Sequence, residues 1–289
     1  MNNLDQLACE FDVILKKYLP SKKSPEIIYE SVFYSLFAGG KRIRPILLLQ
    51  SCSLACGDLN FAQPLAAAIE MIHTYSLIHD DLPCMDNDDY RRGKLTNHKM
   101  FSYPVAVLAG DALLNMAYET IMNGYFGVKD KDSYMKAAFI IAKAAGIDGM
   151  IAGQTADITL EGAEPDKKAV DFIHKHKTSA LIEASIHAGM LSGKLDDEQQ
   201  LHLLEYASCI GMMFQIVDDI LDVVGDEGVM GKDTGKDDNK MSYPRAYGLD
   251  ESYAKVEYLK NKSIESLKIF GSKADFFKNL TLFLSERNK

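Results

Sequence analysis

The sequence predicts an all-α fold in a single domain that spans residues 1–289. Long stretches are rich in Ala, Leu, Ile and Met, and no series of segments shows the alternation of apolar and polar residues that marks strands. The eight prolines fall between these stretches, where a proline can begin a helix without breaking one. No Gly/Ser-rich linker, low-complexity tract or short repeat divides the chain, so one helical unit is expected.

Ten helices are expected along the chain, and prolines lie between several of them. A length of 289 residues, with 47% apolar and 25% charged residues, is ordinary for a globular protein with a sizeable core. The last helix should break near Gly271. The expected helices cover residues 5–19, 25–38, 45–56, 64–82, 104–123, 132–147, 166–175, 178–192, 197–225 and 251–285.

The overall charge and the cysteines argue against several classes of protein. A net charge of −9 does not favour a nucleic-acid partner or an anionic membrane surface. No uninterrupted apolar run is long enough to span a bilayer, and the N-terminus does not read as a signal peptide. The five cysteines are odd in number and form no C-x-x-C pair, so neither a disulfide framework nor a zinc site is expected. We therefore expect a reduced protein of the cytoplasm.

A dense group of charges follows the fourth expected helix, in the segment HDDLPCMDNDDYRRGK at 79–94. A solvated loop is the ordinary interpretation of such a run. An EF-hand calcium loop does not fit, because counting from Asp86 the sixth position is Arg91 instead of glycine and the twelfth is Asn97 instead of glutamate. Pro83 should end or kink the helix near residue 82, so that the turn brings Asp86 back beside Asp80.

A second acidic group lies inside the otherwise apolar helix FQIVDDILDVVGD. Asp218 and Asp222 are four residues apart and share a helix face, with Gln215 one turn below Asp218. Carboxylates on the apolar part of a helix are costly unless a cation compensates them. A helix end that reaches water near Gly225 is the alternative explanation.

Two oxygen-rich groups near helix ends suit magnesium, if they face one another across a helical bundle. Magnesium prefers one or two carboxylates together with water and substrate phosphate oxygens. Cations beside carboxylates in an acidic protein suggest a bound anion, although each one alone would be read as a surface residue. No G-x-x-x-x-G-K-[ST] loop is present, so a nucleoside triphosphate is not implied. The cations in question are Lys41, Arg42, Arg44, Arg91, Arg92, Lys177, Lys232, Lys236 and Lys240.

With these motifs in view, the chain resembles the trans-isoprenyl diphosphate synthases, and most closely the bacterial short-chain group of farnesyl and geranylgeranyl diphosphate synthases. The first aspartate motif has the form D-D-x-x-x-x-D and the second the form D-D-x-x-D. The resemblance implies an all-α isoprenoid-synthase-type bundle around a deep central cavity, the use of Mg²⁺, and a homodimer. It runs in order through GGKRIRP at 39–45, IHTYSLIHDDLPCMDNDDYRRG, AGDALL at 109–114, GMIAGQTADI at 149–158, HKTSALI at 176–182, FQIVDDILDVVGD and GKDTGKDDNKMSYP, which ends at 244.

The resemblance also implies roles for the matched residues. It assigns the magnesium ions to Asp80, Asp86 and Asp218, with support from Asp81, Asp219 and Asp222. It assigns the allylic diphosphate to Arg91, Lys177, Thr178, Gln215, Lys232 and Lys240, and isopentenyl diphosphate to Lys41, Arg44, His73 and Arg92. The residues expected to carry catalysis are Asp80, Asp86, Asp218, Lys177 and Lys232. His73 lies seven residues before Asp80 on the same helix face, where it would suit an anion as a donor, although a buried core histidine is the usual interpretation.

The implied reaction is ionisation, condensation and elimination. Diphosphate leaves the allylic carbon as its charge is neutralised, the double bond of isopentenyl diphosphate attacks the allylic cation, and a proton is lost. Three alternatives are a class I terpene cyclase, a metal-dependent phosphohydrolase that uses His73, His79 and Asp80, and a non-catalytic helical interaction protein. The cyclase usually has Asn/Asp, Ser/Thr and Glu in its second motif, and the other two leave the second aspartate motif without a role.

The residues before Asp80 predict the product length, because the growing tail should run into the cavity beside the same helix. Tyr75 lies five residues earlier, a rise of roughly 7 Å, and Ser76 lies four residues earlier. In the family, an aromatic residue at the fifth position before the motif accompanies short products. We therefore expect the fifteen-carbon farnesyl diphosphate, with the twenty-carbon geranylgeranyl diphosphate as the alternative.

Overall fold

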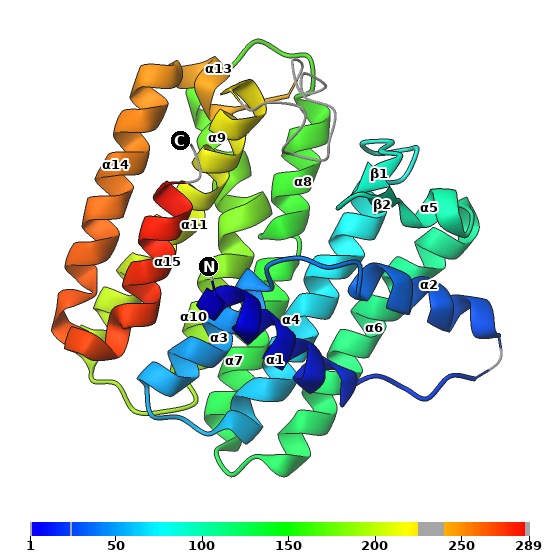
Figure 1. Cartoon of the computed structure of the whole chain (residues 1–289), viewed down its shortest axis with the longest axis horizontal. Helices are drawn as coiled ribbons and strands as arrows, with labels where there is room; N and C mark the ends of the chain where they lie inside the picture. The colour runs from blue at the N-terminus through cyan, green and yellow to red at the C-terminus, as the bar shows by residue number, and fades with distance from the viewer. Residues whose placement is uncertain (1, 24, 225–239, 287–289) are drawn as a thin grey trace.

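The computed structural model describes residues 2–23, 25–224 and 240–286, and it confirms the all-α prediction (Figure 1). A π-helix, η1 (His174–Ser179), and a 3-10 helix, η2 (Lys268–Ala274), join longer helices, and strands β1 (Tyr90–Arg91) and β2 (Lys94–Leu95) form a small antiparallel hairpin. The α-helices are α1 (Asn2–Lys16), α2 (Glu26–Leu36), α3 (Ile43–Leu54), α4 (Leu59–Asp80), α5 (Asn97–Met100), α6 (Tyr103–Gly127), α7 (Lys131–Ala145), α8 (Met150–Thr159), α9 (Lys167–Ile173), α10 (Ala180–Met190), α11 (Asp197–Val224), α13 (Tyr243–Tyr247), α14 (Leu249–Ser266) and α15 (Asp275–Ser285).

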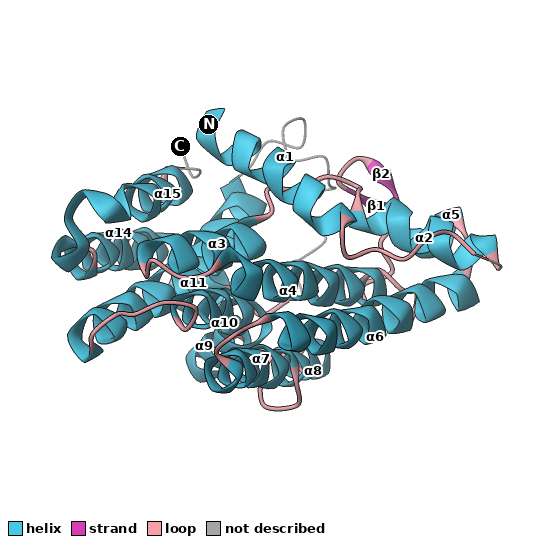
Figure 2. Cartoon of the chain, turned by 90° about the horizontal axis from the view of Figure 1, so that it is seen from below, coloured by secondary structure: helices cyan, strands magenta, loops and turns pink. Residues whose placement is uncertain are grey.

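Helix α4 is the centre of the bundle. It packs against α6 most extensively, and also against α3, α10, α7, α2 and α1, as Figure 2 shows from below. A helix that is covered on every side is apolar on every side, and the run LAAAIEMI at 65–72 is buried throughout. The end of α4 at Asp80 therefore carries the first aspartate motif out of the most buried element of the protein.

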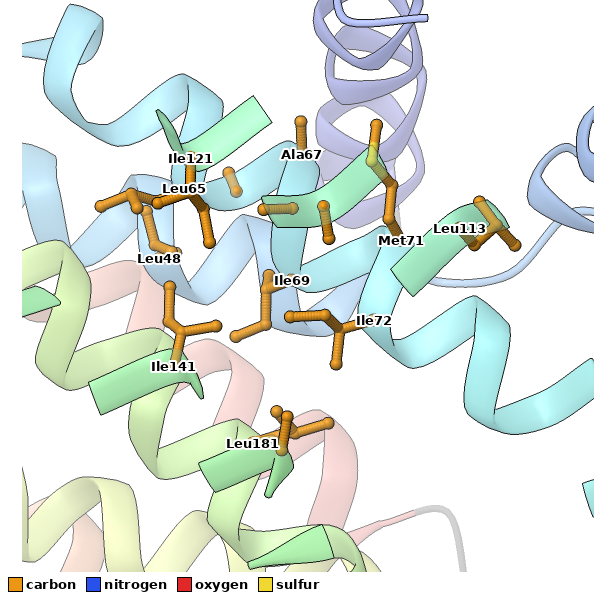
Figure 3. Packing of buried hydrophobic residues seen from close by; sticks show 14 of the residues in the cluster. Leu48, Leu65, Ala67, Ile69, Met71, Ile72, Leu113, Ile121, Ile141 and Leu181 are labelled. Atoms are coloured by element: carbon orange, nitrogen blue, oxygen red, sulfur yellow. The ribbon is translucent and has the colours of Figure 1, made fainter. Parts of the chain in front are cut away.

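Two apolar clusters fill the interior. The first surrounds α4 and includes Ile69 and Met71 of α4, Leu113 of α6 and Leu181 of α10, which Figure 3 labels. The second surrounds α11, where α10, α14 and α15 pack against it. Close packing of this kind holds the ends of α4 and α11, and with them the two aspartate motifs, in fixed positions.

The structure corrects the prediction that every proline lies outside the helices. Helix α4 begins at Leu59, where Asp58 caps it by accepting a hydrogen bond from the Asn60 amide at 2.8 Å, so Pro64 lies inside the helix. Its ring meets Gly124 of α6, where an added Cβ would come within 2.7 Å of the proline Cγ. The missing side chain on α6 makes room for the ring.

Some elements were not predicted, although the positions of most helices were. Helix α8, the hairpin, α5 and α13 lie where no regular element was expected. The predicted break near Gly271 is confirmed, because this residue has φ 57° and separates α14 from α15. Lys232 and Lys236 lie outside the described residues, and the extension of one domain over residues 1–289 stays a prediction.

Helix α6 is long and apolar enough to cross a membrane by length and composition alone, with 39% of its most apolar window buried. A core helix of a helical bundle passes the same test, and α6 packs along α4. Its exposed positions also include the polar residues Asp111, Asn115 and Glu119. Packing against α4 therefore accounts for much of its apolar composition.

The contact between α4 and α6 predicts opposite effects for two glycine substitutions in α6. Gly124→Ala should lower the free energy of unfolding by about 1–3 kcal/mol, because its Cβ would overlap Pro64 and the buried hydroxyl of Tyr134. Gly127→Ala is the matched control, with no atom within 4 Å of the added Cβ, and should be neutral or stabilising by up to about 1 kcal/mol. Urea unfolding measures both changes, and equal effects would contradict the tight contact.

Candidate active site

The first aspartate motif forms a turn at the end of α4. The helix ends at Asp80, and the Asp86 amide donates a hydrogen bond to the Asp80 carbonyl at 2.9 Å. This bond confirms the prediction that the turn after Pro83 brings Asp86 back beside Asp80. The backbone of the motif is therefore closed on itself before any ligand binds.

Two cations hold carboxylates of this motif. Arg91 donates from Nε and Nη2 to Oδ1 of the buried Asp81, at 2.6 and 2.5 Å. Lys240 places its Nζ 3.4 Å from Oδ2 of Asp86. Arg91, which was expected to contact the allylic diphosphate, binds Asp81 in this structure.

The charge of Asp80 is incompletely compensated by its surroundings. Burial raises the pKa of its carboxyl to about 6, the cation of Lys177 opposes this rise, and the neighbouring Asp86 adds to it. A carboxylate with a raised pKa still has negative charge that its surroundings do not neutralise. A divalent cation would supply what is missing.

Asp219 of the second aspartate motif, on α11, is held by hydrogen bonds from neighbouring residues. Asp219 is buried and accepts hydrogen bonds from Gln215 Nε2 at 2.8 Å and from the Tyr243 amide at 2.7 Å. Gln215 in turn accepts a bond from Thr178 Oγ1 at 2.6 Å. The structure thus brings together Gln215 and Thr178, as expected, and also Tyr243, which was not singled out.

Lys177 is fixed by Asp157, a residue for which no role was predicted. Its Nζ donates to Oδ2 of the buried Asp157 at 2.6 Å. Asp157 lies in the segment GQTADI, where Gly153 approaches the backbone of Lys177 so closely that a Cβ would overlap it. Both Lys177 and Thr178 belong to η1, and single turns of π-helix are frequent at functional sites.

The expected isopentenyl diphosphate group begins with Arg44 and His73. Arg44 Nη1 lies 3.2 Å from His73 Nε2, and since arginine only donates, this nitrogen of His73 accepts. Burial, followed by the charge of Arg44, lowers the pKa of His73 well below its ordinary value, so the ring is neutral. The expectation that His73 donates to an anion can therefore apply only to its other ring nitrogen.

Arg44 itself has an unfilled donor. Its Nε is buried and has no hydrogen-bond partner among the described residues. Burial lowers the pKa of its guanidinium to about 10, while the carboxylates of Glu70 and Asp218 oppose this change. Arg44 remains charged at neutral pH, and an anion would satisfy the buried donor.

The loop before α3 brings Arg92 to the same region. Arg92 donates to the Gly39 carbonyl, and a Cβ on Gly40 would lie 2.6 Å from its guanidinium carbon. Gly40 has φ 121°, so this position needs glycine both for its backbone and for the approach of Arg92. Lys41 is exposed, with its Nζ 5.2 Å from the ring centre of Phe283.

Arg42, which lies between the two expected ligands Lys41 and Arg44, is turned away from them. It has φ 52° and donates to Asp12 at 3.0 Å, to the buried Glu70 at 2.7 Å and to the Leu36 carbonyl at 2.7 Å. These bonds join α1, α4 and the end of α2. Arg42 therefore fixes the loop and does not take part in binding an anion through its guanidinium.

The donor set fits magnesium as an ion that a substrate helps to bind. Among residues 2–23, 25–224 and 240–286, no three His, Cys, Asp or Glu side chains are grouped closely enough to hold a metal alone. Magnesium needs only one or two protein carboxylates when phosphate oxygens and water complete its shell. The raised pKa of Asp80 supports this interpretation, since the charge of that carboxylate is incompletely neutralised.

Tyr75 lies in the packing between α4 and α6. It is 7% exposed, and its ring meets that of His79 edge to face at 5.8 Å. Burial raises the pKa of its hydroxyl to about 12, and Tyr118 and Asp80 add to the rise. Ser76 is half-buried and donates to the His73 carbonyl at 2.9 Å. Both expected chain-length residues thus lie on α4 below the metal motif.

An all-helical bundle with two aspartate motifs and cations beside both is the architecture of the isoprenoid synthases. The family model described as Polyprenyl synthetase matches residues 25–269, and the chain belongs to this family. It is 48% identical over 251 residues to a chloroplastic geranylgeranyl pyrophosphate synthase of Catharanthus roseus. The aligned region covers 86% of this chain and 70% of that protein.

Solved structures agree with the sequence relatives. An FPP/GFPP synthase from Zymomonas mobilis is similar with a TM-score of 0.86 and 34% identity, over 98% of each chain. A geranyltransferase from Helicobacter pylori, complexed with magnesium and isoprenyl diphosphate, has a TM-score of 0.83 and 32% identity, over 98% of this chain and 96% of that one. The resemblance found in the sequence is confirmed, and the protein is a prenyltransferase. The cyclase, phosphohydrolase and non-catalytic alternatives are set aside.

The raised pKa of Asp80 predicts a pH-dependent difference in stability for the metal-free protein. A folded pKa of about 6, against an ordinary 3.8, means that Asp80 favours folding when protonated and loses this contribution as the pH rises through about 6. Asp80→Asn should therefore raise the free energy of unfolding at pH 8 by on the order of 2 kcal/mol, and change it little near pH 4. Urea unfolding in the presence of EDTA measures both values.

The exposed Asp250 offers the matched control for this experiment. Asp250→Asn should show no comparable gain at pH 8. A stabilisation by Asp80→Asn that is equal at pH 4 and pH 8 would contradict the raised pKa, because it would not follow the titration of this carboxyl.

Proposed function

We propose that the protein is a magnesium-dependent prenyltransferase that condenses isopentenyl diphosphate with an allylic diphosphate. The observation that carries the proposal is the arrangement of opposite charges between α4 and its neighbours. The incompletely neutralised Asp80 lies within the field of Lys177, and the unfilled donor of Arg44 lies beside His73 and within the field of Asp218. A metal-bound diphosphate and a second diphosphate would satisfy both needs.

Each group of residues has a separate task in this proposal. Asp80, Asp86 and Asp218 would hold magnesium, which neutralises the diphosphate as it leaves the allylic carbon. Lys177 and Thr178, together with Gln215, would hold the oxygens of that diphosphate. Lys232 and Lys240 are proposed for the same task, of which Lys232 lies outside the described residues.

The second diphosphate is proposed to lie near Arg44. Its oxygens would accept hydrogen bonds from Arg44 Nε and from Lys41 and Arg92, while His73 orients Arg44 by accepting from Nη1. Isopentenyl diphosphate held there would present its double bond to the allylic cation. This condensation requires no nucleophile from the protein, because the double bond of isopentenyl diphosphate attacks the allylic cation.

Loss of a metal-binding carboxylate should abolish most turnover. Asp80→Ala and Asp218→Ala should each lower kcat/KM by about a hundredfold or more, because charge on the leaving diphosphate would no longer be neutralised. Incorporation of labelled isopentenyl diphosphate measures the rate. The exposed Asp250→Ala is the control and should retain wild-type turnover. A folded Asp80→Ala protein with a near-normal rate would refute the metal assignment.

Two product lengths are supported by different observations, and we place the twenty-carbon product first. The chain shares 48% identity with a relative named geranylgeranyl pyrophosphate synthase, against 34% with one named FPP/GFPP synthase. The fifteen-carbon product is the second candidate, because Tyr75 is a large, buried ring five residues before Asp80. Incubation with magnesium, isopentenyl diphosphate and allylic primers of increasing length, followed by chain-length analysis, decides between them.

The position of Tyr75 predicts how product length responds to substitution. Tyr75→Ala should lengthen the main product by at least one five-carbon unit, because it removes a ring from the path below Asp80. Ser76→Phe should shorten it. Phe61→Ala provides the control, because Phe61 is buried in the same helix, 19 residues before Asp80, roughly 28 Å along the axis. Unchanged products from Tyr75→Ala would show that another residue ends chain growth.

The proposal includes a homodimer, supported by an apolar stripe on the outer face of α6 and α7. Its residues recur at helical spacing and are largely exposed, with Phe126 at 79% and Phe139 at 67%. The exposed polar residues Asp111, Asn115 and Glu119 lie among those of α6, and exposed apolar side chains bordered by polar ones commonly mark an interface. The stripe consists of Leu108, Tyr118, Met122, Phe126, Met135 and Phe139.

The dimer can be tested by sedimentation. The chain has a mass of 32.1 kDa, and we expect twice this value for the wild-type protein. Met122→Glu combined with Phe126→Glu should shift the mass to that of a monomer, because two carboxylates would be buried in the interface. Val13→Glu, at an exposed apolar position on α1, should leave the dimer intact. A wild-type mass near 32.1 kDa would remove this part of the proposal.

A further inference from the structure

Asp219 of the second aspartate motif is occupied by hydrogen bonds from three separate elements. Its Oδ1 accepts from Gln215 on α11 at 2.8 Å. Its Oδ2 accepts from the Tyr243 amide at the start of α13 at 2.7 Å, and lies 3.0 Å from His174 Nε2 on η1. The residue is 7% exposed, so its carboxylate is turned towards these donors and away from solvent.

His174 is buried against Tyr243 and also donates a hydrogen bond to Asp219. It is 2% exposed, and its ring lies nearly parallel to that of Tyr243, with 5.9 Å between the centres. Because a carboxylate only accepts, Nε2 must carry the proton that bonds to Asp219. The other ring nitrogen is buried and finds no partner in the part of the chain that the structure describes, where the bond to Asp219 holds the side chain.

Tyr243 continues the arrangement on its other side. Its ring stacks on that of Tyr247 with 4.2 Å between the centres, and the Tyr247 hydroxyl donates to Asp171 at 2.9 Å on α9. The start of α13 is therefore held from two directions. Asp219 binds its backbone, and a stack of rings that ends on α9 holds its side chains.

The segment held in this way carries a residue of the first aspartate motif's surroundings. Lys240 lies three residues before Tyr243, and its Nζ is 3.4 Å from Asp86. The short segment 240–243 thus bridges the first motif and Asp219 in the second. The element η1, which supplies His174, also supplies Lys177 and Thr178. The bond between His174 and Asp219 therefore holds the element that carries Lys177 and Thr178 against α11.

We propose that His174 is a positioning residue, which acts through Asp219 to hold the segment 240–243 and η1 in register with α11. Asp219 then serves the second motif by orienting its surroundings and not by binding magnesium itself. This inference rests on the proposed function for its effect on turnover, but its structural half can be measured without substrate or metal. Partners of this kind, one step behind the ligands, typically change metal affinity or activity about ten- to a hundredfold when removed.

Two substitutions of His174 separate the hydrogen bond from the packing. His174→Leu removes the donor and keeps an apolar side chain in the buried space. His174→Gln keeps an N–H near the place of Nε2. Tyr206→Phe is the control, since it removes a buried hydroxyl that donates to the Phe277 carbonyl at 3.2 Å elsewhere on α11. Thermal unfolding of each variant establishes that it is folded.

The first measurement is amide hydrogen exchange in the metal-free protein, on peptides that contain Tyr243. His174→Leu should speed exchange of this segment at least about tenfold, because the carboxylate that accepts its amide loses the partner that aims it. His174→Gln should restore most of the protection, and Tyr206→Phe should leave it unchanged. Unaltered protection in His174→Leu would overturn the proposal whether or not the enzyme is active.

The second measurement is the dependence of turnover on magnesium and on each substrate. His174→Leu should lower kcat, or raise the magnesium concentration for half-maximal rate, about tenfold or more, with the KM for isopentenyl diphosphate nearly unchanged. His174→Gln should recover most of this loss. Equal damage by His174→Gln and His174→Leu would overturn the proposal. A wild-type protein that forms no prenyl diphosphate would instead refute the proposed function, while the exchange result would still stand by itself.

Discussion

Carboxylates buried in this bundle have to be compensated, and the positions of its loops depend on how this is done. Asp81 holds Arg91, Asp157 holds Lys177, and Glu70 holds Arg42. A buried charge that loses its partner costs several kcal/mol. Each of these pairs joins segments that are separated along the chain, so the pairs help to fix the hairpin, η1 and the loop before α3.

Two groups in the described part of the chain are incompletely compensated, and they have opposite charges. Asp80 has a raised pKa at the end of α4, and at the start of α3 the buried Nε of Arg44 has no partner within residues 2–23, 25–224 and 240–286. The first needs a cation and the second needs an anion. A metal diphosphate supplies both signs in one ligand, and this is the chemistry expected of the family to which the chain belongs.

Much of this arrangement could be predicted from local sequence. Proline and apolar stretches predicted the helical fold, and Pro83 predicted the turn that returns Asp86 to Asp80. The roles of neighbouring like residues could not be predicted. Arg42 has φ 52° and binds Asp12 and Glu70, whereas Arg44 contacts His73. Asp219 accepts hydrogen bonds from η1 and α13, contacts that a periodic sequence pattern does not indicate. Pairs such as Asp157 and Lys177 are formed by packing between helices, which leaves no periodic signal.

Helix α4 is packed between other helices and ends at the first aspartate motif. The position of a residue along this helix therefore fixes its distance from the motif. The side chains of α4 lie at fixed depths below that motif, with Met71 four residues before Tyr75, a rise of about 6 Å along the axis. Neighbouring helices hold α4 in place, so a substitution at one of these positions leaves Asp80 where it is. Under the proposed function, a lineage could change the length of its product through single substitutions on one rigid element, without rebuilding the chemistry at its end.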